Sequence, residues 1–161
     1  MTGCVTGGSC RVEFKAEPYG GPAARALVAA IQAEYTVRYG GEDATPVDAS
    51  EFAPPDGLFL IAYDDGVPVG CGGWRRHSAD AAELKRMFVM LSARGRGVAR
   101  ALLAELEATA AAAGFTRIVL ETGDRQPEAI ALYSSSGYRP AERFGYYRDA
   151  SGSRYLGKQL G

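Results

Sequence analysis

A glycine- and arginine-rich segment, Arg94-Gly95-Arg96-Gly97-Val98-Ala99, lies between an apolar stretch and a long helix-forming stretch. Glycines let a turn point successive backbone N–H groups into one concavity, and the N-terminus of the following helix adds partial positive charge. Arg94, Arg96 and the next arginine, Arg100, reinforce that charge. The segment is therefore predicted to bind a diphosphate, and the plainer alternative is a surface loop whose glycines only make the turn.

Two other nucleotide-binding motifs fit this segment less well. A Walker A loop needs Lys-Ser or Lys-Thr after its last glycine, and neither is present. A dinucleotide fingerprint would need glycine where Arg100 stands, although Glu121 lies near the distance expected of a ribose-binding acid. The dinucleotide-binding fold also begins with strand-helix-strand units, whereas a predicted hairpin precedes this loop.

The charge of the chain is divided unevenly between its two halves. The 161 residues carry 18 basic and 19 acidic side chains, so the net charge of −1 does not favour nucleic acid or an anionic membrane as partner. Residues 1–84 hold 6 basic and 12 acidic side chains, whereas residues 85–161 hold 12 and 7. Five basic and no acidic residues fall within residues 85–100. An anionic ligand is expected to dock there.

Hydrophobic periodicity and turn signals predict the elements that must position this loop. The predicted strands cover residues 11–17, 57–63, 67–74, 84–91, 115–121 and the stretch from Tyr138 to Leu156, and the predicted helices cover residues 22–38, 98–113 and 127–135. Residues 41–57 lack periodicity and are predicted to form a loop beside a substrate pocket. Three strands in succession suggest an antiparallel meander, and the later strand-helix-strand order implies a right-handed crossover to a parallel strand.

Length and cysteine content bound the organisation of the chain. A chain of 161 residues with 47% hydrophobic residues builds one domain, predicted over residues 11–161 after a flexible tail at residues 1–10. Cys4, Cys10 and Cys71 are odd in number and show no C-x-x-C spacing, so neither a disulfide framework nor a metal site is predicted. A cytoplasmic protein is expected, because the sequence has no apolar run of 18 residues and no signal-peptide features.

Two motifs in this order resemble the GNAT superfamily of N-acetyltransferases. Its acetyl-CoA loop has the pattern Gln/Arg-x-x-Gly-x-Gly/Ala, which Arg94, Gly97 and Ala99 match. The preceding segment, residues 83–89, looks like the family strand that pairs with the pantetheine arm. Downstream, residues 126–138 resemble the second cofactor motif, an Ala-x-x-Leu-Tyr helix followed by Gly-Phe/Tyr, with Gln126 near the place of the family's asparagine.

The resemblance implies a fold and a co-substrate. The fold is mixed α/β, with a central, mostly antiparallel seven-stranded sheet flanked by helices, as in GNAT acyl-CoA N-acyltransferases. The co-substrate is acetyl-CoA, with no metal. The cofactor-binding residues that the resemblance implies are Met87, Phe88, Val89, Arg94, Gly95, Arg96, Gly97, Val98, Ala99, Gln126, Ala129 and Tyr133.

The resemblance also implies a reaction, the direct attack of a neutral amine on the thioester. Backbone N–H groups at Phe88 or Val89 would polarise the thioester carbonyl. Tyr133 matches the tyrosine that gives a proton to the departing thiolate, and the plainer alternative is a core tyrosine. Glu83 is the candidate that takes a proton from the substrate ammonium, and the plainer alternative is a solvated carboxylate. Cys71 is expected to be a packed strand residue.

Two classes of function stay open on the sequence. The first is an acetyl-CoA-dependent N-acetyltransferase acting on a primary amine of a small molecule or peptide. The second is a non-catalytic domain that binds or senses acyl-CoA. Retention of Tyr133 favours the first class, and the acidic N-terminal half leans towards a cationic amine. Neither nucleic acid nor a membrane is an expected partner, and a homodimer stays open.

Overall fold

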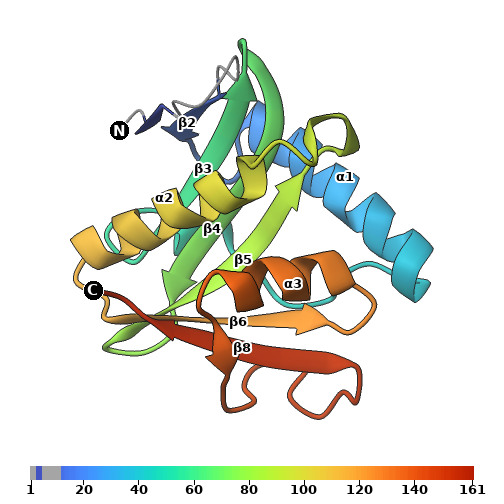
Figure 1. Cartoon of the computed structure of the whole chain (residues 1–161), viewed down its shortest axis with the longest axis vertical. Helices are drawn as coiled ribbons and strands as arrows, with labels where there is room; N and C mark the ends of the chain where they lie inside the picture. The colour runs from blue at the N-terminus through green and yellow to red at the C-terminus, as the bar shows by residue number, and fades with distance from the viewer. Residues whose placement is uncertain (1–2, 5–11) are drawn as a thin grey trace.

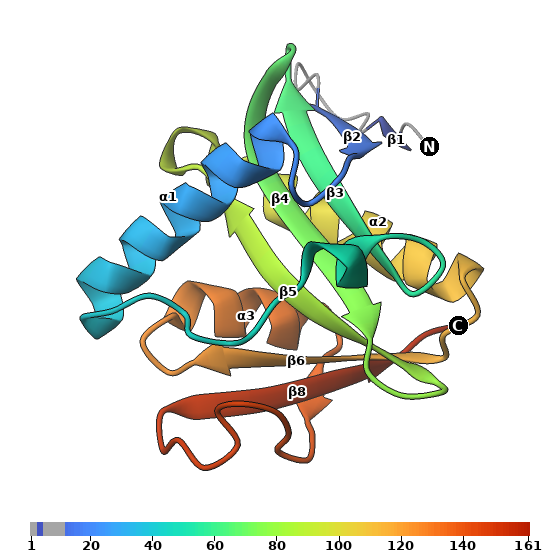
Figure 2. The same ribbon diagram turned by 180° about the vertical axis from the view of Figure 1, so that it is seen from behind.

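A twisted sheet forms the middle layer of the fold, with one helix on one face and two helices on the other (Figures 1 and 2). The computed structural model describes residues 3–4 and 12–161. The helices are α1 (Pro22–Tyr39), α2 (Val98–Ala112) and α3 (Pro127–Ser135), with short 3-10 turns at Ala49–Phe52 and Leu91–Ala93. The strands are β1 (Gly3–Cys4), β2 (Val12–Ala16), β3 (Gly57–Asp64), β4 (Val67–Arg76), β5 (Ala81–Val89), β6 (Arg117–Gly123), β7 (Arg139–Pro140) and β8 (Ser153–Gln159).

The expected mixed, mostly antiparallel sheet is confirmed. Its order is β1-β2-β3-β4-β5-β6-β8-β7, and within it only β5 and β6 are paired in parallel. Strands β2 to β8 are the expected seven, and the two-residue β1 adds to one edge. The meander β3-β4-β5 and the crossover through α2 are confirmed as well. The expected tail and Arg11 lie outside the described residues, apart from residues 3–4.

One predicted strand is wrong. The stretch from Tyr138 to Leu156 is not continuous but divides into the short β7 and the longer β8, joined by a loop over residues 141–152. Gly145, at φ 74°, turns the chain in that loop, and β7 then pairs with β8 as a hairpin. No helix among the described residues is both long and apolar enough to cross a membrane.

Alternation along the strands gives the sheet a hydrophobic core on each face. Leu102 and Leu106 of α2 pack on one face with Ile118 of β6. Ile31 of α1 packs on the other face with Ile61 and Cys71. Cys71 is fully buried, as expected of a packed strand residue, and burial raises the pKa of its thiol.

A β-bulge in β5 changes the direction of the central strand. Cys71 of β4 lies opposite Phe88, but two residues on, Gly73 lies opposite Lys85, so β5 carries one extra residue. The chain accommodates the extra residue at Arg86, whose φ of 60° lies in the left-handed region. Both Lys85 and Arg86 consequently turn their side chains to the α1 face, where they reach the same carboxylate.

Beyond the bulge, β5 separates from its parallel neighbour. The ladder between β5 and β6 pairs only Ala81–Glu83 with Arg117–Val119. The two strands then diverge towards their C-terminal ends (Figures 1 and 2). From residue 84 on, within the described chain, the backbone groups of β5 that face β6 have no strand partner. A ligand can therefore pair with that edge.

Asp43 holds the two turned side chains of the bulge. One of its carboxylate oxygens lies 2.7 Å from Arg86 Nη1 and 3.2 Å from Lys85 Nζ, and all three side chains are nearly buried. Burial raises the pKa of Asp43, but Lys85, the hydrogen bonds from Thr45 and Arg86 together outweigh burial and lower it to about 2. The loop after α1 is thereby fastened to the central strand.

The variant Asp43→Asn is expected to lower the free energy of unfolding by about 3 kcal/mol at pH 7, because it leaves two buried cations without a carboxylate. The pKa of Asp43 falls from an ordinary 3.8 to about 2 on folding. This shift in pKa contributes about 2 kcal/mol to the free energy of unfolding. The contribution is complete above about pH 4 and is lost as the pH falls towards 2. Urea unfolding at several pH values measures this.

The control is Asp149→Asn, because the Asp149 side chain is 96% exposed. This control should unfold like the wild type at every pH. A stability difference between wild type and Asp43→Asn that stays constant from pH 7 to pH 2 would contradict the assigned role of Asp43.

Candidate active site

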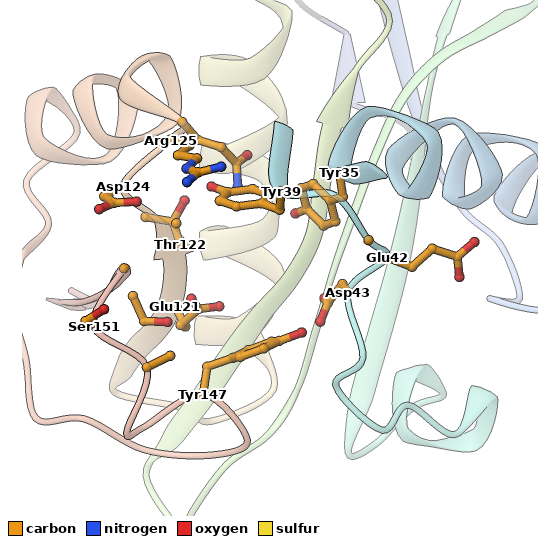
Figure 3. Close-up of a pocket in the computed structure, with 16 residues that line it drawn as sticks. Tyr35, Tyr39, Glu42, Asp43, Glu121, Thr122, Asp124, Arg125, Tyr147 and Ser151 are labelled. Carbon is orange, nitrogen blue, oxygen red and sulfur yellow. The ribbon is translucent and has the colours of Figure 1, made fainter. Parts of the chain in front are cut away.

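Two cavities meet where strands β5 and β6 diverge. The larger, about 450 Å³, is bounded by the C-terminal end of α1, residues 41–43, the end of β6 and the loop before β8 (Figure 3). The smaller, about 50 Å³, lies between β5, β6 and α3. The residues that line both cavities are Tyr35, Asp43, Glu121, Thr122 and Gln126.

Glu121 reaches this junction because of strand alternation. Ile118 and Leu120 of β6 point into the core beneath α2, so Glu121 points to the opposite face, towards the middle of the larger cavity (Figure 3). Burial raises the pKa of the Glu121 carboxyl, and Asp43 adds to that effect, while Ser153 and Lys85 oppose it. The carboxyl therefore ionises less readily than an ordinary glutamate.

Tyr133 lies on the other side of the junction, in the lining of the smaller cavity. Helix α3 begins at Pro127, directly after Gln126, and presents Tyr133 to the sheet. The tyrosine is 6% exposed, and its ring packs edge-to-face on Tyr138 at 5.5 Å between centroids. Burial raises the pKa of its phenol, which keeps the hydroxyl protonated at neutral pH and able to donate.

The two motifs of the sequence meet across the gap between β5 and β6. Met87 of β5 and Gln126, Ala129 and Tyr133 of the second motif all line the smaller cavity. Phe88 and Val89, the other strand residues singled out, pair with Cys71 and Gly70 of β4. The backbone edge of β5 and the inner face of α3 thus face each other.

The glycine loop turns the chain from β5 into α2. Gly95 and Gly97 have φ angles of 76° and 79°, and a Cβ at either position would meet nothing within 4 Å. Gly97 is the N-cap and no side chain caps this end. Since Val98 and Ala99 lie in the first helical turn, their N–H groups have no intrahelical acceptor, which fits a diphosphate.

The arginines near this loop attach it to the rest of the domain. Arg94 Nε donates to the Val89 carbonyl at 2.8 Å and its Nη2 pairs with Glu34 of α1 at 2.9 Å. Arg96 pairs with Asp64 of β3 at 2.8 Å. Arg100 of α2 donates to Ser135 at 2.8 Å and to Ser136 at 3.1 Å, which links the start of α2 to the end of α3.

Glu83 is not among the residues that line either cavity. Its carboxylate accepts from Arg75 Nε at 3.0 Å, and Arg75 also pairs with Glu51 at 3.2 Å. Tyr35 and Tyr147, two of the aromatic residues that the sequence offers for an acceptor pocket, do line the larger cavity. Asp43 and Glu121 are the lining carboxylates that were not predicted as acceptor-site residues.

Three tyrosines and several carboxylates shape the larger cavity (Figure 3). Its aromatic residues are Tyr35, Tyr39 and Tyr147, and its charged residues are Glu42, Asp43, Glu121, Asp124 and Arg125. Burial raises the pKa of Tyr35 to about 12. The Tyr147 hydroxyl accepts from the Ala44 N–H at 2.8 Å, which joins the loop before β8 to the loop after α1.

The end of this cavity is closed by contacts between α1 and the turn after β6. Arg38 and Arg125 each donate to the other's backbone carbonyl, at 2.9 and 3.0 Å. Tyr39 packs so closely against Gly123 that a Cβ at position 123 would lie 1.9 Å from the tyrosine oxygen. A larger residue at position 123 would therefore displace the Tyr39 ring from this end of the cavity.

Comparison with known proteins agrees with this geometry. An Azospirillum brasilense protein named IAA acetyltransferase is 38% identical over 123 residues, which span 76% of this chain and 80% of the relative. The structure of a Klebsiella pneumoniae protein described as an acyl-CoA N-acyltransferase superposes with a TM-score of 0.80 at 28% identity, over 95% of this chain and 99% of that one.

A GNAT acetyltransferase from Elizabethkingia anophelis, solved with acetyl-CoA bound, shares the fold with a TM-score of 0.68 at 16% identity, over 92% of this chain and 98% of that one. The profile of the acetyltransferase (GNAT) family matches residues 24–138, which run from α1 through the glycine loop to the end of the second motif. The chain therefore belongs to the GNAT superfamily of N-acetyltransferases.

Proposed function

We propose that this protein transfers the acetyl group of acetyl-CoA to a primary amine of a small molecule. The observation that carries the proposal is the meeting of two cavities, one between the diverging strands and one open to solvent, at a shared set of polar residues. The Elizabethkingia fold neighbour binds acetyl-CoA, which supports the same ligand here. A domain that only senses acyl-CoA would have no need of the second cavity.

The residues present fit acetyl-CoA, which supplies an activated acetyl thioester when bound. The N–H groups at the start of α2, behind Gly97, would hold the diphosphate. The open edge of β5 from Leu84 to Val89 would pair with the amides of the pantetheine arm. Met87 and Ala129 would flank that arm in the smaller cavity.

Tyr133 would protonate the leaving thiolate. Its hydroxyl belongs to the smaller cavity, and burial keeps the phenol protonated. The Met90 N–H donates to the Val69 carbonyl of β4, so alternation turns the N–H of residue 88 to β4 and that of residue 89 to the open edge. Of the two predicted donors, Phe88 and Val89, the Val89 N–H would therefore donate to the carbonyl oxygen of the thioester, where negative charge develops during attack. Both groups would act on the acetyl-transfer step and contribute little to holding the nucleotide.

The charge of the larger cavity favours an acceptor amine that carries a second positively charged group, besides the reacting ammonium, and no carboxylate. Its lining holds four carboxylates and one guanidinium. Lys85 and Arg86 already bind Asp43, and Arg125 donates to a backbone carbonyl, so each cation near the junction has a partner. The volume of about 450 Å³ lies in the range of small-molecule sites.

The variant Gly97→Glu is expected to weaken acetyl-CoA binding about 100-fold or more, because a carboxylate at the start of α2 would repel the diphosphate. Titration calorimetry measures the affinity. The matched control is Gly114→Glu, since Gly114 also has a positive φ and open space but lies at the other end of α2. Equal affinities in the two folded variants would show that the loop is only a turn.

The variant Tyr133→Phe should lower the turnover rate about 100-fold while acetyl-CoA affinity stays near that of the wild type. The change removes one hydroxyl and keeps the ring that packs on Tyr138. Steady-state kinetics with a limiting chemical step measure it. Tyr138→Phe is the control, because that hydroxyl bonds Glu107 at 3.1 Å and lies outside both cavity linings. Unchanged turnover in Tyr133→Phe would make Tyr133 a core residue.

Three four-carbon amines of matched length test the acceptor: 1,4-diaminobutane, butylamine and 4-aminobutanoate. We expect acetylation to be most efficient with the diamine and least efficient with the carboxylate, with kcat/KM at least about tenfold apart between these two. Mass spectrometry identifies the products. Asp124→Asn, which neutralises a carboxylate of the larger cavity, should reduce the preference. Binding of acetyl-CoA without any acetylated amine would instead favour the sensing function.

A further inference from the structure

We propose that Glu121 is the catalytic residue that takes the proton from the acceptor ammonium. The inference rests on the proposed transferase function and assigns a step in it to one side chain. Glu121 thereby takes the role that the sequence predicts for Glu83.

The position of Glu121 carries the proposal. Two carboxylates, Asp43 and Glu121, line both cavities. Asp43 is engaged by Lys85 and Arg86, whereas Glu121 has no salt bridge within the part of the chain that the structure describes. Glu83 lines neither cavity and is held by Arg75. Glu121 takes a hydrogen bond from Ser153 but forms no ion pair with any described residue, so of the two carboxylates it is the one that can meet an amine entering through the larger cavity.

Glu121 and Tyr133 also share the smaller cavity. One group belongs to β6 and points to the α1 face, and the other belongs to α3 on the opposite face, so they approach the gap between the strands from two sides. An amine beside Glu121 and a sulfur beside Tyr133 would face each other there. Glu121 would thus lie next to the nitrogen of the C–N bond that forms, and Tyr133 next to the sulfur of the C–S bond that breaks.

The groups that surround Glu121 set its ionisation. They are Lys85 and Glu83 on β5, Asp43 in the loop after α1, Tyr35 on α1, Tyr147 in the loop before β8, and Ser153 and Tyr155 on β8. Burial is the strongest influence and raises the pKa of Glu121, which brings this base closer to the pH at which it works. Glu121 acts as a base only when ionised, so the rate rises with pH through this pKa.

The protons balance over one turnover. Glu121 removes one proton from the ammonium and passes it to solvent through the larger cavity. The neutral nitrogen then attacks the thioester carbonyl carbon, so a C–N bond forms and the C–S bond breaks. Glu121 accepts the second nitrogen proton, and Tyr133 protonates the departing thiolate. Glu121 then releases that second proton to solvent, and the Tyr133 phenolate regains a proton from solvent, so both groups return to their starting states. In net terms nitrogen loses two protons, one of which is balanced by the new thiol while the other enters solvent.

The test compares Glu121→Gln with wild type, using 1,4-diaminobutane as acceptor over a range of pH. At pH 7 we expect kcat/KM to fall about 100-fold or more, with acetyl-CoA affinity and melting temperature nearly unchanged. The loss should shrink as the pH rises, because solvent then supplies neutral amine. Glu121→Asp should keep the pH dependence at a reduced rate. The control is Glu105→Gln on α2, which lies outside both cavity linings.

A second readout does not depend on activity. In a carbon NMR titration of the protein without acetyl-CoA, the carboxyl signal that disappears in Glu121→Gln should titrate at a pH above that of an ordinary glutamate. An ordinary pKa, or a rate loss that is the same at every pH, would overturn the proposal. The proposal would also be overturned if Glu83→Gln, and not Glu121→Gln, abolished the rise of kcat/KM with pH. If wild type binds acetyl-CoA but acetylates no amine, the proposed function itself fails, and this inference with it.

Discussion

The buried contact of Asp43 with Lys85 and Arg86 is the interaction on which the rest of the site depends. A bulge with a non-glycine residue at positive φ is costly, and here two ion pairs stabilise it. The bulge lies where β5 leaves β6, and that divergence exposes a strand edge. The same ion pairs fasten the loop after α1, which forms one wall of the larger cavity.

The sheet separates two tasks that the proposed reaction must combine. Helices α2 and α3 on one face carry Tyr133 and the turn proposed to bind the diphosphate, and Arg100 links the two helices through Ser135. On the other face, α1 and its loop build a tyrosine-lined chamber that is negatively charged. In the proposed reaction, the gap between β5 and β6 would let the amine and the thioester meet directly, so that no enzyme nucleophile is needed.

Local signals in the sequence are enough for most of the fold and for the elements that carry the candidate site. Two helix start signals act over only a few residues: Gly97 before an uninterrupted helical pattern, and Pro127 before Tyr133. The helices that follow them could therefore be predicted. The bulge at Arg86 could not, because it depends on Asp43, which is 43 residues away in the chain. Glu83 is predicted as a proton acceptor from its place at a strand start, but that strand begins earlier, at Ala81, and Arg75 across the ladder pairs with Glu83. Such an ion pair between neighbouring strands cannot be predicted from local sequence signals.

The close packing of Tyr39 on Gly123 has a consequence for how this enzyme could diversify. A side chain larger than hydrogen at position 123 requires the tyrosine to move or to be replaced by a smaller residue. Either change would open the end of the larger cavity, at residues that do not line the smaller one. Paired substitutions at positions 39 and 123 therefore offer a route by which the proposed acceptor cavity could lengthen while Tyr133 and Glu121 stay in place.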